Sequence, residues 1–355
     1  MKKIVCVSIM GLLLGLSLYA GGGKEQATPG KAAPAKEAAP AKQETVYLNM
    51  GSTSSTSGVY AWCVAAANAV NKSGQGIQVT VVESGAGIDN LRKVKAGTFD
   101  FALAVDVPST YQLYKGIDTF KDQAYPEIRW LLVRNIIADR LYVRKDSGVT
   151  KWSDLAGKRF CPGIPGSAAA TYVTRFNEIL KTGVNLVPMA LGDAINALKE
   201  NRIVGLQKSS GLFAIDASLI EVNMTTPLTA IGFTKEETQQ IMKAMPYLSF
   251  VETKKGSIKE LPDAGPFFEE AAIAGGVATS KLSQEIGYKI VKAYYENLAD
   301  IQAAYGPAKG WDPVADYFKF AGDEAVPAHA GLVQFAKEKG IQVPARFIPP
   351  EYKDK

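Results

Sequence analysis

The feature that most constrains this chain is a pattern that occurs three times: an apolar run, a turn rich in Gly and Ser, and then a helix-like stretch. The apolar runs span residues 46–50, 79–83 and 159–161, the turns 51–58, 84–87 and 162–167, and the helical stretches 59–70, 88–94 and 168–180. Alternating strands and helices predict an α/β fold. Each turn would place unpaired backbone N–H groups at a helix start, which suits a small anionic group such as a carboxylate. We therefore expect capture of a small solute.

Ten residues in these turns and at nearby strand ends are candidates for solute contact. They are Ser54, Ser57, Tyr60, Glu83, Ser84, Asp106, Gly163, Gly166, Ser167 and Ser210. The turn over residues 163–167 is the best carboxylate cradle, and a second turn over residues 207–211 would add to it. The alternative for the hydroxyls is that they only cap helices, which Ser does often.

Charged candidates also have two interpretations. Glu83 and Asp106 follow strands that we expect to be buried, where ligands sit in open parallel sheets, and either carboxylate would suit an ammonium group. The alternatives are a surface Glu and an Asx turn before Pro108. Arg140 and Arg144 flank a strand that crosses between the two halves, and each would pair with a solute carboxylate or with an acid of the protein.

Length and charge set the class of protein. The 355 residues suffice for one large or two ordinary domains, and 47% hydrophobic with 21% charged residues is typical of a soluble globular protein. The formal charge of +5 includes Lys2 and Lys3, whose removal leaves +3. That charge is too small to indicate nucleic-acid binding, and no basic cluster is interleaved with aromatic residues.

The first 45 residues predict export. A basic start, an apolar stretch over residues 4–18 and a small-residue end near Ala20 indicate a signal peptide over residues 1–20. The alternative is an uncleaved N-terminal anchor, although the apolar stretch is short for a membrane span. Residues 21–45 are rich in Ala, Lys, Gly and Pro and contain no aromatic residue, which predicts a disordered linker. We expect a periplasmic location.

The pattern of the remaining chain predicts two α/β blocks. In the first block, residues 79–82 predict a strand buried on both faces, and further strands are expected over residues 99–105, 130–133 and 140–143. The second block predicts strands over residues 158–161, 186–189 and 203–206, and helices over residues 172–180 and 192–200. A helix with a capping box is expected over residues 234–245. A late strand over residues 271–278 and a helix over residues 282–304 follow, and a last helix over residues 330–339.

No catalytic or metal-binding set is visible. The single histidine, His329, lies near the C-terminus, far in sequence from the turns, so no Ser-His or Cys-His pair is expected. No His or Cys spacing suggests a metal, and the Gly-rich turns lack the residues of dinucleotide and phosphate-binding motifs. Cys63 and Cys161 fall on a helix and a strand of different blocks, which favours two buried free thiols over a disulfide. We expect no enzyme activity, cofactor or metal.

The motifs from residue 51 to about 280 resemble the TAXI family, the TRAP-associated extracytoplasmic immunogenic proteins. Its motifs match Ser57-Gly58-Val59-Tyr60, the run from Val81 to Leu91, Gly97 to Leu103 with Asp106, Tyr142 to Gly148 with Asp154 to Arg159, Gly163 to Ser167, and Ala194 to Lys199. The chain departs from the family at Ala61, where a second Tyr is frequent, at Ala170, where an acid is frequent, and at Val204-Gly205, where Asp-Ala is usual. Family members with amino-acid ligands such as glutamate therefore do not fix this ligand.

The resemblance implies a solute receptor of a tripartite ATP-independent periplasmic (TRAP) transporter. The expected fold is α/β and periplasmic-binding-protein-like (type II), with two lobes joined by a two-strand hinge. The first lobe would comprise residues 46–143 and 268–355, and the second residues 144–267. Expected partners are a small anionic or zwitterionic solute, such as an amino acid or organic acid, and the membrane subunits of a TRAP permease. The alternatives are a receptor for an ABC importer, a surface antigen or adhesin, and, disfavoured by the inventory above, a hydrolytic enzyme.

Overall fold

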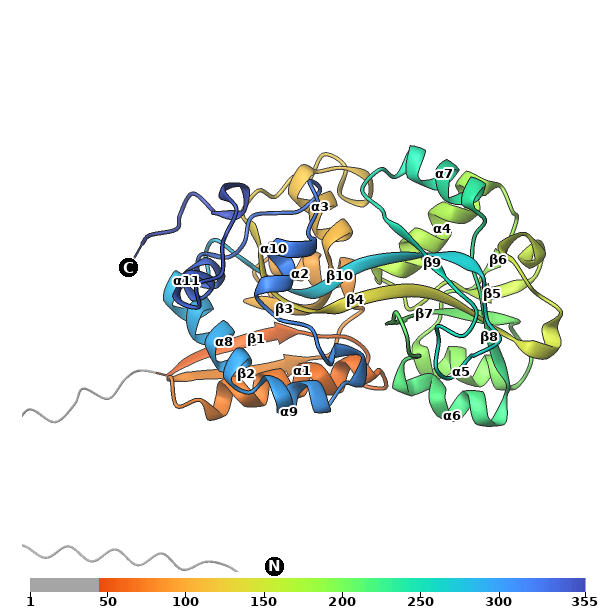
Figure 1. Ribbon diagram of the computed structural model, residues 1–355, viewed down its shortest axis with the longest axis horizontal. Coiled ribbons are helices and arrows are strands. Elements are labelled where there is room, and N and C mark those ends of the chain that lie inside the picture. Colours follow the sequence, from red (N-terminus) through yellow and green to blue (C-terminus); the bar gives the residue numbers. More distant parts are fainter. Residues whose placement is uncertain (1–44, 355) are drawn as a thin grey trace, which may run out of the picture. The chain divides into compact units, whose positions relative to one another are not determined.

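The computed structural model describes residues 45–354, and the predicted signal peptide and nearly all of the predicted linker lie outside them. A ten-stranded sheet runs through this part in the order β2-β1-β3-β10-β4-β7-β5-β6, with β8 paired to β4 and β9 paired to β10. Two long antiparallel neighbours, β4 (Ile128–Arg144) and β10 (Phe267–Thr279), lie at its centre. Figure 1 shows both strands passing from one group of helices to the other.

The first lobe is built on one side of these two strands. Its elements are β1 (Val46–Gly51), α1 (Gly58–Lys72), β2 (Ile77–Val82), α2 (Gly87–Lys95), β3 (Phe101–Asp106) and α3 (Val107–Lys115). β1 pairs in parallel with both β2 and β3, as right-handed strand–helix–strand units require. The carboxyl ends of β1, β2 and β3 therefore lie at one edge of the sheet, where the three helices start.

The second lobe repeats this construction on the other side. Its strands are β5 (Arg159–Cys161), β6 (Asn185–Leu186), β7 (Gly205–Gly211), β8 (Leu228–Ile231) and β9 (Phe250–Thr253). Its helices are α4 (Ala168–Leu180), α5 (Leu191–Lys199), α6 (Ala217–Thr225) and α7 (Lys235–Ala244). The predicted capping box of α7 is confirmed: Thr234 accepts from the Glu237 N–H, and the Glu237 side chain accepts from the Thr234 N–H.

The C-terminal helices return to the first lobe. They are α8 (Gln284–Glu296), α9 (Leu298–Ala303), α10 (Ala315–Phe320) and α11 (Ala330–Glu338). The Trp62 indole N–H of α1 donates to the Tyr294 hydroxyl of α8 at 2.7 Å, and the Trp130 and Tyr317 rings stack 5.2 Å apart. The predicted α/β fold of two lobes joined by two strands is confirmed by this topology.

The hinge strands carry a buried ion pair on one face. Arg140 of β4 donates to Glu269 of β10 through Nε at 2.9 Å and Nη2 at 2.7 Å, with both side chains fully buried. Arg144 instead pairs with Asp146 at the protein surface. Both arginines therefore have acids of the protein as partners, which was the second of the two interpretations.

Several sequence predictions are wrong in detail. β2 is the edge strand, with Gln78 and Thr80 exposed, so residues 79–82 are not buried on both faces. Residues 130–133 and 140–143 belong to one strand, β4, rather than two. Residues 207–211 lie within β7 and form no turn. The strand expected over residues 186–189 is only β6, and the helix expected over residues 282–304 is interrupted at Asn297.

Two further observations concern cysteines and membranes. Cys63 and Cys161 are both buried free thiols, as expected. Within residues 45–354, none of the helices combines the length and apolar character that crossing a membrane requires.

Candidate functional site

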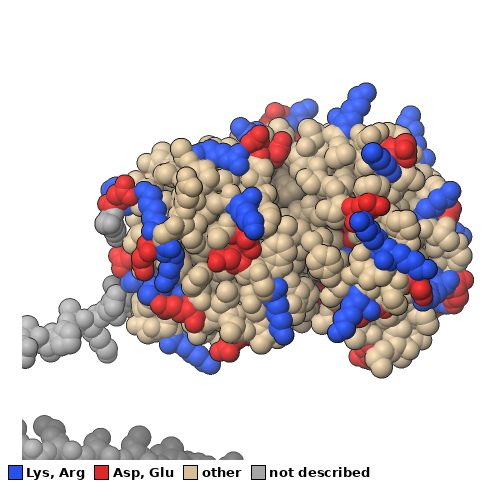
Figure 2. All heavy atoms as spheres, in the orientation of Figure 1, with Lys and Arg blue, Asp and Glu red and all other residues tan. Residues whose placement is uncertain are grey.

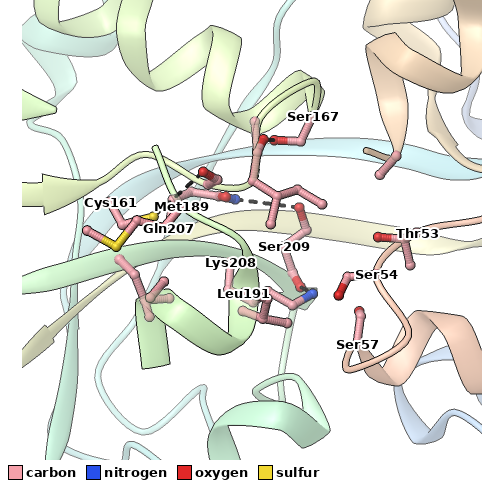
Figure 3. Close-up of a pocket in the computed structure, with 16 residues that line it drawn as sticks. Thr53, Ser54, Ser57, Cys161, Ser167, Met189, Leu191, Gln207, Lys208 and Ser209 are labelled. Carbon is pink, nitrogen blue, oxygen red and sulfur yellow. Dashed lines mark hydrogen bonds between the residues drawn. The ribbon is translucent and has the colours of Figure 1, made fainter. Parts of the chain in front are cut away.

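A cavity with two connected compartments lies at the junction of the two lobes. The side compartment, with an empty volume of about 510 Å³, extends into the second lobe. The hinge compartment, of about 480 Å³, reaches β3, β4 and β10. Thr53, Ser57, Ser167, Lys208 and Ser209 line both compartments, which makes them one continuous space. Figure 3 shows Thr53 and Ser57 of the first lobe facing Lys208 and Ser209 of the second.

Each of the three Gly/Ser turns contributes to the cavity wall through a helix start. Ser57 caps α1 by accepting from the Val59 N–H at 3.3 Å, and Ser167 caps α4 by accepting from the Ala170 N–H at 3.1 Å. Ala86 precedes α2 with φ 62° and makes no side-chain cap. All three residues line the cavity. The partial positive ends of three helices thus face one space, which favours a bound anion.

The turns also contact one another across the cleft. The Asp89 N–H at the start of α2 donates to the Gly166 carbonyl at 3.0 Å. Gly166 has φ 88°, a conformation that glycine adopts at little cost. A Cβ added to Gly85 would lie 2.7 Å from the Pro165 carbonyl oxygen. The lobes are therefore in backbone contact on this side of the cavity, as in a closed receptor.

Arg134 of β4 is one of two cationic side chains that line the hinge compartment, together with Lys208. Its side chain is buried at 4% exposure, and the centroids of the Trp62 and Tyr305 rings lie 5.3 and 5.5 Å from the guanidinium carbon. Nε donates to Asn135 Oδ1 at 2.8 Å, whereas Nη1 has no hydrogen-bond partner among the described residues. A buried guanidinium with an unused donor is costly, and an acidic ligand group would offset that cost.

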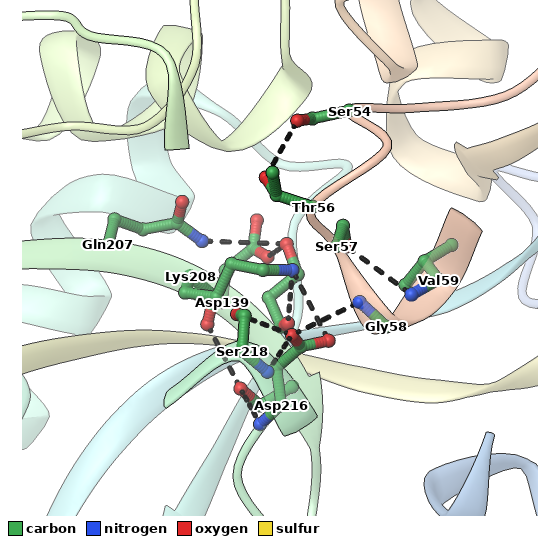
Figure 4. A network of polar contacts seen from close by, with 12 residues as sticks. Ser54, Thr56, Ser57, Gly58, Val59, Asp139, Gln207, Lys208, Asp216 and Ser218 are labelled. Carbon is green, nitrogen blue, oxygen red and sulfur yellow. Dashed lines mark hydrogen bonds and ion pairs between the residues drawn. The ribbon is translucent and has the colours of Figure 1, made fainter. Parts of the chain in front are cut away.

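A second polar network joins the lobes at Lys208 of β7 (Figure 4). Lys208 Nζ lies 3.4 Å from Asp216 Oδ2, and Asp216 also accepts from the Gly58 N–H of α1 at 3.5 Å. Burial opposes the charged form of Asp216, but Lys208 and the bonds from Ser218 hold the pKa of Asp216 below its ordinary value. Lys208 therefore has a fixed anionic partner beside the cavity.

Two buried carboxyl groups complete the hinge compartment. Asp139 of β4 accepts a short hydrogen bond from the Ser209 hydroxyl, and burial raises the pKa of Asp139 to about 7. Asp106 caps α3 by accepting from the Ser109 N–H at 2.7 Å and accepts from the Tyr172 hydroxyl of α4 at 3.1 Å. Burial raises the pKa of Asp106 as well. Asp139 is thus easily protonated near neutral pH, and Asp106 takes up a proton more readily than an ordinary aspartate.

Five of the ten predicted residues line the cavity. They are Ser54, Ser57, Asp106, Gly163 and Ser167. Asp106 caps α3, in agreement with the Asx interpretation, and it also faces the hinge compartment, so contact with a solute stays a prediction.

The other five predicted residues do not line the cavity. Glu83 is exposed and accepts from the Ser55 N–H at 2.9 Å, and Ser84 bonds to Asn90 and the Ser52 carbonyl inside the first lobe. Tyr60 is half-buried on α1, and Gly166 contacts α2 through its carbonyl. Ser210 is fully buried on β7, where it bonds to the Tyr142 hydroxyl at 2.7 Å, because its side chain points away from the face that carries Ser209.

Four functional candidates were missed by sequence reasoning: Arg134, Asp139, Lys208 and Ser209. The signal was present, since Arg134 and Asp139 interrupt an otherwise apolar run. The sequence pattern predicts two strands in this run, residues 130–133 and 140–143, so Arg134 and Asp139 fall in the expected loop between them. Lys208 and Ser209 were placed in a turn that does not exist.

Other features give no sign of catalysis or nucleic-acid binding. His329 caps α11 by accepting from the Gly331 N–H at 3.1 Å, and burial lowers the pKa of His329 to about 4. Within residues 45–354, no group of His, Cys, Asp and Glu is arranged to hold a metal ion. Figure 2 shows Lys and Arg intermixed with Asp and Glu on one face of the molecule.

Fold and site together define a two-lobed α/β protein with a cavity between its lobes, the architecture of periplasmic binding proteins. The chain belongs to the NMT1-like family, whose model matches residues 50–340. No curated protein matches it significantly.

Solved structures with detectable similarity have low sequence identity. An ancestral arginine-binding protein bound to arginine is 14% identical, covering 74% of this chain and 98% of its own, with a TM-score of 0.45. The periplasmic aliphatic sulphonate binding protein SsuA from Escherichia coli is 13% identical, with coverages of 75% and 78% and a TM-score of 0.41. The GluR0 ligand-binding core from Nostoc punctiforme in complex with L-glutamate is 13% identical, with coverages of 74% and 99% and a TM-score of 0.44.

Proposed function

We propose that this protein is an extracytoplasmic receptor that captures a small carboxylate-bearing solute between two lobes and delivers it to a membrane permease of the TRAP type. The first lobe comprises residues 46–143 and 268–355, and the second residues 144–267. The observation that carries the proposal is the convergence of three helix starts and buried Arg134 on one cavity between the lobes. The protein acts by binding and closure and not as an enzyme.

Closure is the step that would make capture useful to a permease. Only β4 and β10 continue from one lobe into the other through the centre of the sheet, which makes a soft hinge. Ligand groups from both lobes favour the closed state, so solute shifts the population toward it. A closed receptor presents a surface that the open form lacks, and the permease would recognise that surface in the periplasm.

Native mass spectrometry of the purified exported chain tests the receptor proposal. We expect a bound small molecule that is lost on denaturation, and a mature N-terminus between Gly21 and Gly23. An intact Met1 on most of the protein in cell fractions would indicate an N-terminal anchor instead. Saturable binding to host matrix, with no bound solute and no response to any small molecule, would favour the adhesin alternative.

The transporter class needs its own experiment because an ABC importer uses receptors of the same fold. The receptor and its permease are tested in vesicles that contain no ATP. Uptake driven by an ion gradient alone supports the TRAP assignment. Uptake that requires ATP would assign the receptor to an ABC importer.

A further inference from the structure

The two compartments of the cavity differ in chemistry. Four charged side chains line the hinge compartment: Asp106, Arg134, Asp139 and Lys208. In the side compartment Lys208 is the one charged residue, and it lies where the compartments join. The second lobe gives the side compartment an apolar wall, while Gln207 and hydroxyl side chains line much of the rest of it. The apolar wall is made by Ile164, Ala169, Met189, Leu191, Ala194 and Leu206.

The charged end suits an acidic head group. Arg134 lines the hinge compartment, its Nη1 is buried without a hydrogen-bond partner among residues 45–354, and its Nε is fixed by Asn135. The guanidinium also contacts the Trp62 and Tyr305 rings, so with the Asn135 bond its position is set before any ligand arrives. Lys208 cannot replace it, because its charge is already matched by Asp216 at 3.4 Å.

The apolar end excludes a second charge. A carboxylate placed against Met189, Leu191 and Leu206 would lose hydration that these three side chains cannot replace, which is unfavourable. An aliphatic chain in the same place gains by burial of its methylene groups. The hinge compartment thus favours a charged head group, and the apolar wall of the side compartment favours an apolar chain.

We propose that the cavity takes a solute with one acidic head group and one apolar chain, the head toward Arg134 and the chain toward the apolar wall of the side compartment. This inference rests on the receptor function proposed above and narrows its substrate class. It disfavours dicarboxylates and acidic amino acids, although these would fit the cavity in size. The substituent beside the head group, amino or oxo, faces Asp106 or Asp139 and is distinguished by the experiment.

Calorimetry with two matched pairs of probes tests this class. The purified chain is freed of bound solute by unfolding and refolding, then titrated with L-leucine and L-glutamate, and with 4-methyl-2-oxopentanoate and 2-oxoglutarate. In each pair the compounds share a head group and differ in an apolar or a charged end. We expect the apolar member of at least one pair to bind 10-fold or more tightly than its charged partner. The better pair identifies the amino or the oxo substituent.

Variants locate the two ends of the ligand. Met189→Arg should reverse the preference toward the dicarboxylate member, whereas Met224→Arg, at a position 81% exposed on α6, should leave it unchanged. Arg134→Met should weaken binding of both members of a pair at least 10-fold. Because Arg134 is buried, Arg134→Lys serves as a second variant that retains the charge and should recover part of the affinity.

The outcomes separate this inference from the receptor function. Tighter binding of L-glutamate or 2-oxoglutarate would overturn the proposed class and leave the receptor function standing. If none of the four probes binds, the chemical class of the small molecule released by denaturing the native protein tests the proposal. A singly acidic solute with an apolar chain supports the proposal, and a dicarboxylate, sugar or cation overturns it. Absence of any bound molecule, with no probe binding, would contradict both proposals.

Discussion

The Tyr172 hydroxyl of α4 donates a hydrogen bond of 3.1 Å to Asp106 Oδ1 at the end of β3, joining the two lobes beside the cavity. Gln112 of α3 donates to the same hydroxyl at 3.4 Å. Both partners of Tyr172 belong to the first lobe, so these bonds form only when the lobes meet. The side chains at this junction are fully or almost fully buried.

Replacing this tyrosine should weaken capture without disturbing either lobe. Tyr172→Phe removes the inter-lobe hydrogen bond and keeps the ring, at a cost of about 1 kcal/mol to the closed state. We expect solute affinity to fall about 5-fold, measured by calorimetry. Tyr288→Phe is the control, since its hydroxyl bonds to Glu338 among the C-terminal helices. Equal affinities for Tyr172→Phe and the parent would show that this contact does not stabilise closure.

Gly166 offers a test of the contact between turns. A Cβ at this position would lie 3.2 Å from the Asp89 Cβ of the other lobe and would face a φ of 88°. Gly166→Ala should therefore lower solute affinity about 10-fold, because crowding against Asp89 acts in the closed state alone and costs about 1.4 kcal/mol. Gly183→Ala is a matched control, because Gly183 has φ 73° with no atom within 4 Å of an added Cβ. The control should lose stability only, and a comparable loss of affinity in both variants would refute an inter-lobe role for Gly166.

Asp139 makes stability depend on pH in a defined direction. Burial raises its folded-state pKa to about 7, above an unfolded value of about 3.9. Its stabilising contribution is therefore complete below about pH 4 and is lost as pH rises toward 7. We expect Asp139→Asn to gain stability relative to the parent between pH 5 and pH 8, as measured by urea unfolding. Parallel pH profiles of the two proteins would contradict the raised pKa.

The buried pair on the opposite face of the hinge predicts a large effect on folding. Glu269→Gln leaves Arg140 buried with a weakened partner, and breaking such a pair costs about 3 to 5 kcal/mol. Asp146→Asn removes the partner of Arg144 at the surface and should change stability little. Denaturant titrations of both variants measure the change in the free energy of unfolding that each substitution causes. A small, equal effect of both changes would mean that the hinge pair does not hold β4 and β10 together.

The fold was predictable because its signals are local and repeated. Three Gly/Ser turns after apolar runs identified β1–α1, β2–α2 and β5–α4, and Ser57 and Ser167 were placed correctly at helix starts. The return of the chain to the first lobe followed from one late apolar strand, now β10. Periodicity could not show that β2 lies at the sheet edge, because edge position depends on strand order rather than on composition.

The site was only partly predictable, for a physical reason. Its helix-start residues are marked by turn chemistry, whereas Arg134 and Asp139 lie inside a long strand, where polar residues suggest a break. Their burial is made possible by partners distant in sequence, such as Tyr305 beside Arg134 and Ser209 beside Asp139. Tyr305 reaches Arg134 only when the C-terminal segment returns to the first lobe, and Ser209 reaches Asp139 only when β7 pairs with β4.

The central claim is that solute closes the two lobes, and an inter-lobe distance measures this directly. Lys121 and Glu236 are exposed positions in the first and second lobes, and Cys63 and Cys161 are buried, so Lys121→Cys with Glu236→Cys accepts a pair of spin labels selectively. Pulsed electron–electron double resonance on solute-free protein should give a distribution of label distances that is broader or longer than in the solute-bound protein. Addition of the solute identified by native mass spectrometry should narrow this distribution and shift it to shorter distances. An unchanged distribution at saturating solute would contradict the account.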